Sequence, residues 1–145
     1  MESNVNKIAI IDPDDFEETY KAGLKYLHGV CGVSKDITQA HYYLRLSAQH
    51  EYWPALRTLA FMHMDGIGLE RNPWRAFVRF KYLANEGCVK ARYMTGLMYE
   101  HGEGEEQHYD RSLVYYEKAA KRGCPEAKVK VRELTKLIKI MNKEY

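Results

Sequence analysis

Small and apolar side chains recur along this chain with a period of 36 residues, and three consecutive copies of the pattern can be overlaid. The second copy is anchored by Ala55 and the third by Ala91, and the period continues to Ala127. The first copy begins near Phe16 and carries one extra residue within 29–32. Repetition at this period predicts one supersecondary unit that is used three times.

Each copy contains two segments with helical spacing. In the first segment a small residue is followed three positions later by an aromatic residue or a histidine, which places both on one helix face. These pairs are Gly23 with Tyr26, Ala60 with His63, and Gly96 with Tyr99. The second segment carries an apolar stripe typical of an amphipathic helix. Its positions are Ala40, Leu44, Ser47 and Ala48, then Ala76, Phe80, Leu83 and Ala84, then Ser112, Tyr116, Ala119 and Ala120.

Residues with special backbone preferences mark the predicted helix ends. Gly29, Gly66 and Gly102 are expected to end the first helices, because glycine adopts a left-handed cap conformation without steric cost. Asp36 and the pair Asn72-Pro73 are expected to start second helices, since they provide a capping side chain and, at 73, a proline at the first helical position. The sequence therefore predicts a helix-turn-helix in each copy.

The third copy departs from this pattern at the start of its second helix. His108 occupies the cap position and Asp110 lies in the first turn, so we expect a looser or shifted start. Gly87 and Gly123 are expected to end the second helices of copies two and three, whereas Glu51 stands at that position in the first copy.

The two ends of the chain are predicted to differ in character. Asp12-Pro13 predicts the start of the first helix, after an N-terminal arm over 1–11. The apolar run Ile8–Ile11 is expected to cover the first repeat, and docking into a neighbour's groove to give a weak homodimer is the second reading. Residues 126–143 predict a capping helix. Its apolar stripe is Val131, Leu134, Ile138 and Met141, and its outer face carries Lys128, Arg132, Lys136, Lys139 and Lys143.

No single copy can cover its own apolar face, so neighbouring copies must stack. The predicted fold is all-α, an α-solenoid of about three helix-turn-helix repeats with a C-terminal capping helix, wound as a right-handed superhelix. One domain is expected over 1–145. Its repeats are placed at 13–52, 53–88 and 89–124.

The repeated residues resemble the Sel-one-like repeat family, which is related to the tetratricopeptide repeats. The third copy carries the resemblance best, through Thr95-Gly96, Tyr99, Gly102, Gly104, Tyr115-Tyr116, Lys118-Ala119-Ala120 and Gly123. The departures are His63, Thr95, Asn72 and the extra residue near Cys31. The resemblance implies a non-enzymatic adaptor, regulator or immunity-type inhibitor, often bacterial, whose concave groove binds a protein or peptide. Fold alone does not fix such a role.

Groove positions of the related tetratricopeptide repeats can be carried over to the first helix of each copy. They are Tyr20, Leu24, His28, Arg57, Phe61, Met64, Asp65, Tyr93, Leu97, Glu100 and His101. Aromatic, arginine and methionine side chains are enriched at protein interfaces. Leu24, Phe61 and Leu97 fit core packing equally well. The polar members are the better candidates for partner contacts, because a polar side chain enters a core only when it is paired.

Composition narrows the function classes. The chain has 145 residues, 46% of them hydrophobic and 29% charged, and this length is too short for a multidomain enzyme. Its formal net charge of +2 is too balanced to favour nucleic acid as a partner. No apolar run approaches the ~20 residues of a membrane helix, and the first residues do not read as a secretory signal. Three cysteines without a CxxC spacing fit reduced thiols. We therefore expect a cytoplasmic protein.

Candidate chemistry outside the groove is weaker. The segment 100–110 gathers histidines and acids, yet it lacks the HExxH and calcium-loop spacings, so a solvated loop is expected and no metal or cofactor is predicted. Signatures of nucleophilic or nucleotide chemistry are missing, so neither an enzyme nor a small-molecule substrate is expected.

Residues 117–145 carry nine bases and four acids. This basic C-terminal helix offers the alternative function, which is binding of nucleic acid or anionic lipid. Attraction to the acidic residues 1–36 of another copy is a further reading.

Overall fold

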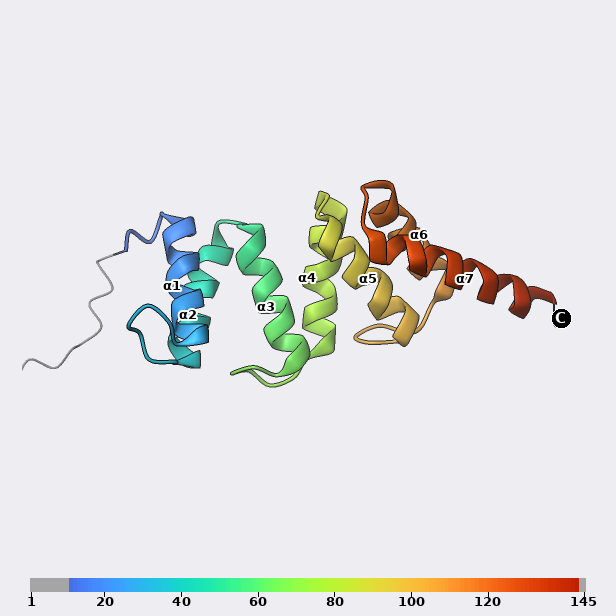
Figure 1. Ribbon diagram of the computed structural model, residues 1–145. Helices are drawn as coiled ribbons and strands as arrows, with labels where there is room; N and C mark the ends of the chain where they lie inside the picture. The colour runs from blue at the N-terminus through green and yellow to red at the C-terminus, as the bar shows by residue number, and fades with distance from the viewer. Residues whose placement is uncertain (1–10, 144–145) are drawn as a thin grey trace, which may run out of the picture. The chain divides into compact units, whose positions relative to one another are not determined.

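The computed structural model describes residues 11–143, and within that range every regular element is an α-helix (Figure 1). The helices are α1 Phe16–His28, α2 Ile37–Gln49, α3 Trp53–Asp65, α4 Pro73–Glu86, α5 Val89–His101, α6 Tyr109–Lys121 and α7 Pro125–Lys143. The predicted all-α repeat fold with a C-terminal helix is confirmed. Residues 1–10 of the predicted arm lie outside the described residues. Among the described helices none is long and apolar enough to cross a membrane.

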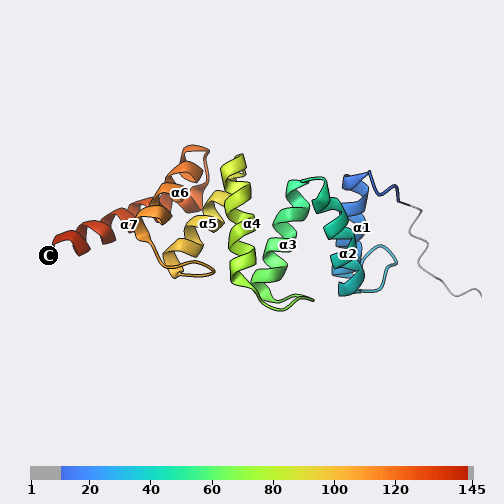
Figure 2. The ribbon, with the colours of Figure 1, turned by 180° about the vertical axis from the view of Figure 1, so that it is seen from behind.

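The chain divides between residues 71 and 72 into two compact units. In the first unit α1 packs on α2 and α2 packs on α3, and Figures 1 and 2 both show α1 and α2 side by side. Leu44, Leu59 and Met62 form its buried cluster. A Cβ atom on Gly23 would lie 2.9 Å from Cγ of Leu44. The glycine therefore allows α1 and α2 to approach closely.

The second unit contains α4 to α7, and each of these helices packs on the next. Phe80, Tyr99 and Tyr116 are among its largest fully buried side chains. Gly96 repeats the role of Gly23, because a Cβ atom there would lie 2.6 Å from Cδ1 of Tyr116. The small residues at contact positions thus set the helix spacing in both units, as the periodic pattern predicts.

Most predicted helix ends are confirmed. Gly29, Gly66 and Gly102 adopt left-handed φ angles of 64°, 69° and 69° at the ends of α1, α3 and α5. The side chains of Asp36 and Asn72 accept hydrogen bonds from backbone N–H groups in the first turns of α2 and α4. Local capping preferences were therefore sufficient to place these boundaries.

The predicted start of the first helix at Asp12-Pro13 is wrong. Helix α1 begins at Phe16, where the Asp15 carboxylate accepts a hydrogen bond from the backbone N–H of Glu18. The Asp15 N–H donates to the carbonyl of Asp12 at 2.9 Å, which closes a turn with Pro13 in its second position. Proline at that position favours a turn, so the aspartate after the turn becomes the cap.

The predicted loose or shifted start of α6 is also wrong. His108 caps the helix with Nδ1, which accepts a hydrogen bond of 3.2 Å from the backbone N–H of Arg111. Helix α6 therefore begins at Tyr109, one repeat period after Pro73 begins α4. The reason is chemical, because an unprotonated imidazole nitrogen can accept the same hydrogen bond as the amide oxygen of Asn72.

Candidate functional site

The predicted groove residues lie on α1, α3 and α5, and none of them is fully buried. His28, Asp65 and His101 are exposed, and the other eight are half-buried. By contrast, the small residues Ala22, Ala60 and Ala91 on the same helices are buried. The half-buried state of Leu24, Phe61 and Leu97 allows both packing and surface roles. Contact of this set with a partner stays a prediction.

In the first unit Tyr20 connects α1 with the start of α3. Its hydroxyl lies 3.5 Å from Oγ1 of Thr58, and its ring lies edge-on to Tyr52 with centroids 5.4 Å apart. The ring of Phe16 lies 5.1 Å from the same Tyr52 ring. Sequence reasoning missed Tyr52 and Thr58, which are on the facing segment. The residue one repeat after Tyr20 is Arg57, which adjoins Thr58 on α3, and this register was the available signal.

In the second unit Glu100 is engaged inside the protein. Its carboxylate accepts a 2.5 Å hydrogen bond from the hydroxyl of Tyr116 on α6 and lies 3.3 Å from Nζ of Lys130 on α7. The Glu100 side chain is 18% exposed. A polar side chain is found in a packed position only when it is paired, and Glu100 is paired with both a hydrogen-bond donor and a cation.

Burial changes the acidity of two tyrosines near this pair. Burial first, and then the hydrogen bond to Glu100, raise the pKa of Tyr116 far above its ordinary value. Burial also raises the pKa of Tyr93, against the opposing effect of Lys130. The Tyr93 and Tyr116 rings lie 5.7 Å apart. Both phenols therefore stay protonated at neutral pH, where the Tyr116 hydroxyl donates to Glu100 and the Tyr93 ring offers an aromatic surface.

A cavity of about 530 Å³ opens beside Tyr93. Its wall on α5 is formed by Val89, Lys90, Tyr93 and Met94. The opposite wall is formed by Arg122, Gly123 and Cys124 of the α6–α7 turn and by Glu126 at the start of α7. Tyr93 is the one member of the predicted groove set that lines it. The periodic pattern could not reveal this cavity, because it results from missing side-chain volume.

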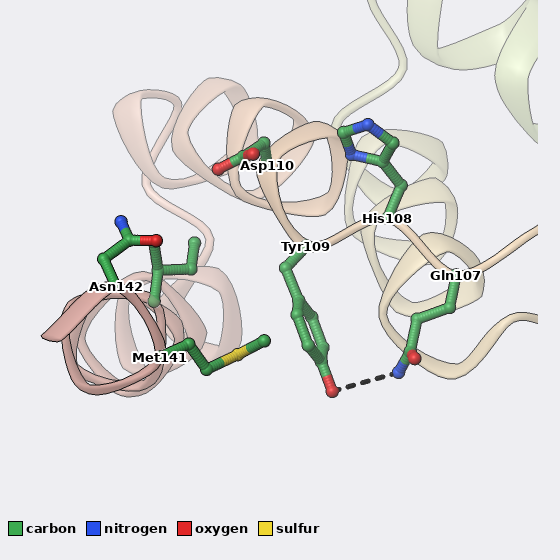
Figure 3. Close-up of a pocket in the computed structure, with 7 residues that line it drawn as sticks. Gln107, His108, Tyr109, Asp110, Met141 and Asn142 are labelled. Atoms are coloured by element: carbon green, nitrogen blue, oxygen red, sulfur yellow. Dashed lines mark hydrogen bonds between the residues drawn. The ribbon is translucent and has the colours of Figure 1, made fainter. Parts of the chain in front are cut away.

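A smaller hollow of about 290 Å³ lies between the start of α6 and the end of α7 (Figure 3). Tyr109 and Met141 line it, and the amide of Gln107 donates a hydrogen bond of 3.0 Å to the Tyr109 hydroxyl. The acid-rich segment 100–110 runs beside it. Among the described residues no group of three or more histidine, cysteine, aspartate or glutamate side chains is placed to hold a metal ion.

Comparison with known proteins places these observations in a family. The Sel1 repeat model matches residues 19–52, 53–78 and 89–124. Chitin synthase regulatory factor 2 of Schizosaccharomyces pombe is 32% identical over 124 residues, covering 79% of this chain and 24% of that protein. Chitin synthase regulator SKT5 of Malassezia restricta is 25% identical over 118 residues, covering 80% of this chain and 8% of that protein. The chain thus spans about a quarter or less of the length of these relatives.

Solved structures agree with the repeat assignment. A Sel1 repeat protein from Oxalobacter formigenes has a TM-score of 0.76 and 28% identity, covering 83% of this chain and 92% of that one. The protective antigen c5321 from uropathogenic Escherichia coli, described as displaying an SLR fold, has a TM-score of 0.75 and 25% identity, covering 81% and 27%. The cysteine-rich protein B of Helicobacter pylori, at 14% identity and a TM-score of 0.63, covering 83% and 96%, shows the fold alone. On the matched repeats and their structural likeness, the chain belongs to the Sel1 repeat family.

Proposed function

We propose that this chain is a non-enzymatic protein-interaction module that acts as an adaptor or regulator of a protein partner. The observation that carries the proposal is the separation of roles on α1, α3 and α5, where small packing residues are buried and chemically varied neighbours stay at the surface. Its relatives from Schizosaccharomyces pombe and Malassezia restricta, named as regulators of chitin synthase, support a regulatory role. A cytoplasmic location and a bacterial source belong to the proposal as well.

Within each unit the proposed contact residues are those that the fold leaves accessible. In the first unit they centre on Arg57, Phe61 and Asp65 of α3. In the second unit they centre on Tyr93 and Leu97 of α5. Arginine and aromatic side chains supply much of the binding energy at protein interfaces. Because packed helices hold these side chains before a partner arrives, less conformational entropy is lost on binding.

Glu100 takes a different role in this proposal from that of a direct contact. Its pairing with Tyr116 and Lys130 supports a positioning function, since it connects α5 with both following helices. A partner that displaced Lys130 would leave a half-buried carboxylate with fewer partners. We therefore place Glu100 beneath the contact surface and Tyr93 on it.

The test is affinity capture from lysate of the source cells with quantification by mass spectrometry. The Arg57→Ala/Tyr93→Ala variant removes one arginine from the proposed contact residues of the first unit and one tyrosine from those of the second unit. The matched control Tyr42→Ala/Arg45→Ala removes the same residue types from the exposed face of α2. A stoichiometric protein captured by wild type and control but lost from the first variant supports the proposal. Retention of that protein by the first variant overturns the site.

The alternative function, binding of nucleic acid or anionic lipid through the basic helix α7, can be tested in the same way. Lys136 and Lys139 are exposed on it, and Glu133 lies one turn earlier on the same helix. Binding to phosphate groups is expected to weaken steeply as salt rises and to be abolished by Lys136→Glu/Lys139→Glu. Binding through the proposed surface is expected to respond to Arg57→Ala/Tyr93→Ala instead. The two variants therefore separate a protein partner from nucleic acid or anionic lipid.

A further inference from the structure

The cavity beside Tyr93 occupies a repeat position that is filled with aromatic rings in the first unit. Tyr20 and Tyr93 are both the fifth residue of their helices, α1 and α5. Phe16 is the first residue of α1, where α5 begins with Val89. Tyr52 immediately precedes α3, where Cys124 immediately precedes α7. Two rings of the first repeat are therefore replaced by smaller side chains in the third.

The first unit shows how this position accommodates a ring. Tyr52 lies edge-on to Tyr20, with centroids 5.4 Å apart and an interplanar angle of 72°. Phe16 closes the other side of Tyr52 at 5.1 Å. Edge-to-face pairs at these distances are favourable, because the positive edge of one ring meets the negative face of the other.

In the second unit the same position is open. Cys124 and Val89 leave a cavity of about 530 Å³ against Tyr93 and Met94. This volume lies within the range of about 300–1,000 Å³ that small-molecule pockets commonly have, which is ample for one aromatic ring. Tyr93 is half-buried, so its ring is already held in place by packing against Tyr116. The cavity thus has a fixed aromatic wall and room for a second ring.

Charges at the rim define what can accompany that ring. Lys90 and Arg122 are exposed cations on the two walls of the cavity. Glu126 is the acidic residue of the lining, and its carboxylate lies 3.4 Å from Sγ of Cys124 as acceptor. Lys130, which faces Tyr93 from α7, is paired with Glu100. The rim is therefore net cationic and favours an anionic occupant.

We propose that this cavity is the docking site for an aromatic side chain of a protein partner, carried on a segment with acidic residues beside the ring. The ring packs on Tyr93 as Tyr52 packs on Tyr20, and the acidic residues face Lys90 and Arg122. This inference rests on the proposed function and specifies the chemistry of the partner at the same surface.

The test uses three synthetic probes and needs no identified partner. N-acetyl-Asp-Tyr-Asp-amide, N-acetyl-Asp-Ala-Asp-amide and N-acetyl-Asn-Tyr-Asn-amide are titrated into the full chain carrying ¹³C-methyl methionine. The shift of the Met94 methyl resonance, which reports on the cavity wall, is the readout. We expect saturation by the Asp-Tyr-Asp probe at about millimolar concentration, no saturable shift with the Ala probe, and about threefold to tenfold weaker binding of the neutral probe.

Variants at one position make the test specific. Cys124→Tyr places the residue of the first repeat in the cavity and is expected to weaken the Asp-Tyr-Asp probe by about tenfold or more. Cys124→Ala keeps the cavity open and is expected to bind as wild type does. Circular dichroism checks folding, and Val89→Phe closes the cavity from α5 if Cys124→Tyr does not fold.

Two results overturn the inference. One is the absence of a saturable Met94 shift in the wild-type chain, and the other is an equal affinity in wild type and the filled variant. Neither depends on a captured partner, so the aromatic site can fail while the proposed interaction function stands. Conversely, probe binding together with partner retention by Arg57→Ala/Tyr93→Ala means that the cavity binds a ring but that the captured partner does not use it, which overturns both the proposed surface and the assignment of the cavity to that partner.

Discussion

The hydroxyl of Tyr116 donates a hydrogen bond of 2.5 Å to Oε2 of Glu100, and both residues replace apolar side chains of the first repeat. Leu27 occupies the position of Glu100, and Leu44 occupies the position of Tyr116. In the first unit Leu44 belongs to the buried cluster, and Leu27 packs against that cluster. The third repeat has therefore exchanged an apolar contact for a polar one in which donor and acceptor changed together. Lys130 completes the exchange by pairing with the carboxylate.

Tyr116→Phe is expected to reduce the loss of stability at alkaline pH. Burial and the hydrogen bond to Glu100 raise the pKa of Tyr116 above the ordinary 10.0, so the neutral phenol favours the folded state. This contribution is fully present below pH 10 and declines above it, because the unfolded chain ionises while the folded chain stays neutral. The slope is about 1.4 kcal/mol per pH unit for one such group.

Urea unfolding from pH 8 to pH 11 measures the effect. Near pH 8 the Tyr116→Phe variant is expected to be about 1 kcal/mol less stable, because the carboxylate of Glu100 loses a donor. Tyr42→Phe, on an exposed residue, is the matched control and is expected to follow the wild-type curve. Equal alkaline slopes in wild type and Tyr116→Phe contradict the prediction.

Gly96→Ala is expected to destabilise the second unit although alanine is the better helix former. The added Cβ atom would lie 2.6 Å from Cδ1 of Tyr116, a ring that is fully buried. Overpacking of this kind costs about 1–3 kcal/mol, which exceeds the gain of about 1 kcal/mol in helix propensity. Thermal unfolding measures the difference, with Glu117→Ala on the exposed face of α6 as control. A variant as stable as wild type means that the Tyr116 ring can move aside.

Local signals were sufficient for the helices and their packing faces. The spacing of Gly23 from Tyr26 and of Gly96 from Tyr99 identified the packing face of α1 and α5, and glycine caps identified their ends. These features depend on side chains within one or two helical turns, which a single sequence displays. The wrong start at Asp12-Pro13 arose because several nearby aspartates have the same capping chemistry, and only the turn distinguishes them.

The candidate site was less predictable, because its main features depend on residues in different repeats. The resemblance to the tetratricopeptide repeats put Glu100 in the predicted groove set, but its pairing with Lys130 depends on the packing of α7. The cavity beside Tyr93 exists because Cys124 is smaller than Tyr52, the residue at the same position of the first repeat. A motif search registers residues, whereas a cavity is defined by volume that no residue fills.

The imidazole cap of α6 leads to a graded prediction. Nδ1 of His108 accepts the hydrogen bond of the Arg111 N–H at 3.2 Å, where Asn72 uses an amide oxygen for Arg75 at 3.1 Å. Because asparagine is a preferred capping residue, His108→Asn is expected to raise the free energy of unfolding by about 0.5 kcal/mol. His108→Ala is expected to lower it by about 1 kcal/mol. Urea unfolding at pH 8 measures both, and equal stability of the alanine variant and wild type contradicts the capping role.

Glu51→Gly is expected to stabilise the first unit. Glu51 has a φ angle of 56°, in the left-handed region that disfavours residues with a Cβ atom, and the corresponding residues Gly87 and Gly123 of the second unit have φ angles of 111° and 90°. Relief of the left-handed conformation contributes about 1–2 kcal/mol, and the extra freedom of glycine in the unfolded chain offsets about 0.5–1 kcal/mol. A net gain of about 0.5–1 kcal/mol therefore remains.

Two further variants separate backbone strain from loss of the glutamate side chain. Glu51→Ala removes the carboxylate but keeps the Cβ atom, so it is expected not to reproduce the gain. Gly87→Ala places a Cβ atom at a positive φ angle of 111° and is expected to destabilise its own unit. Thermal unfolding of all three variants measures the difference. A gain in Glu51→Ala equal to that in Glu51→Gly would assign the effect to the side chain and contradict the backbone explanation.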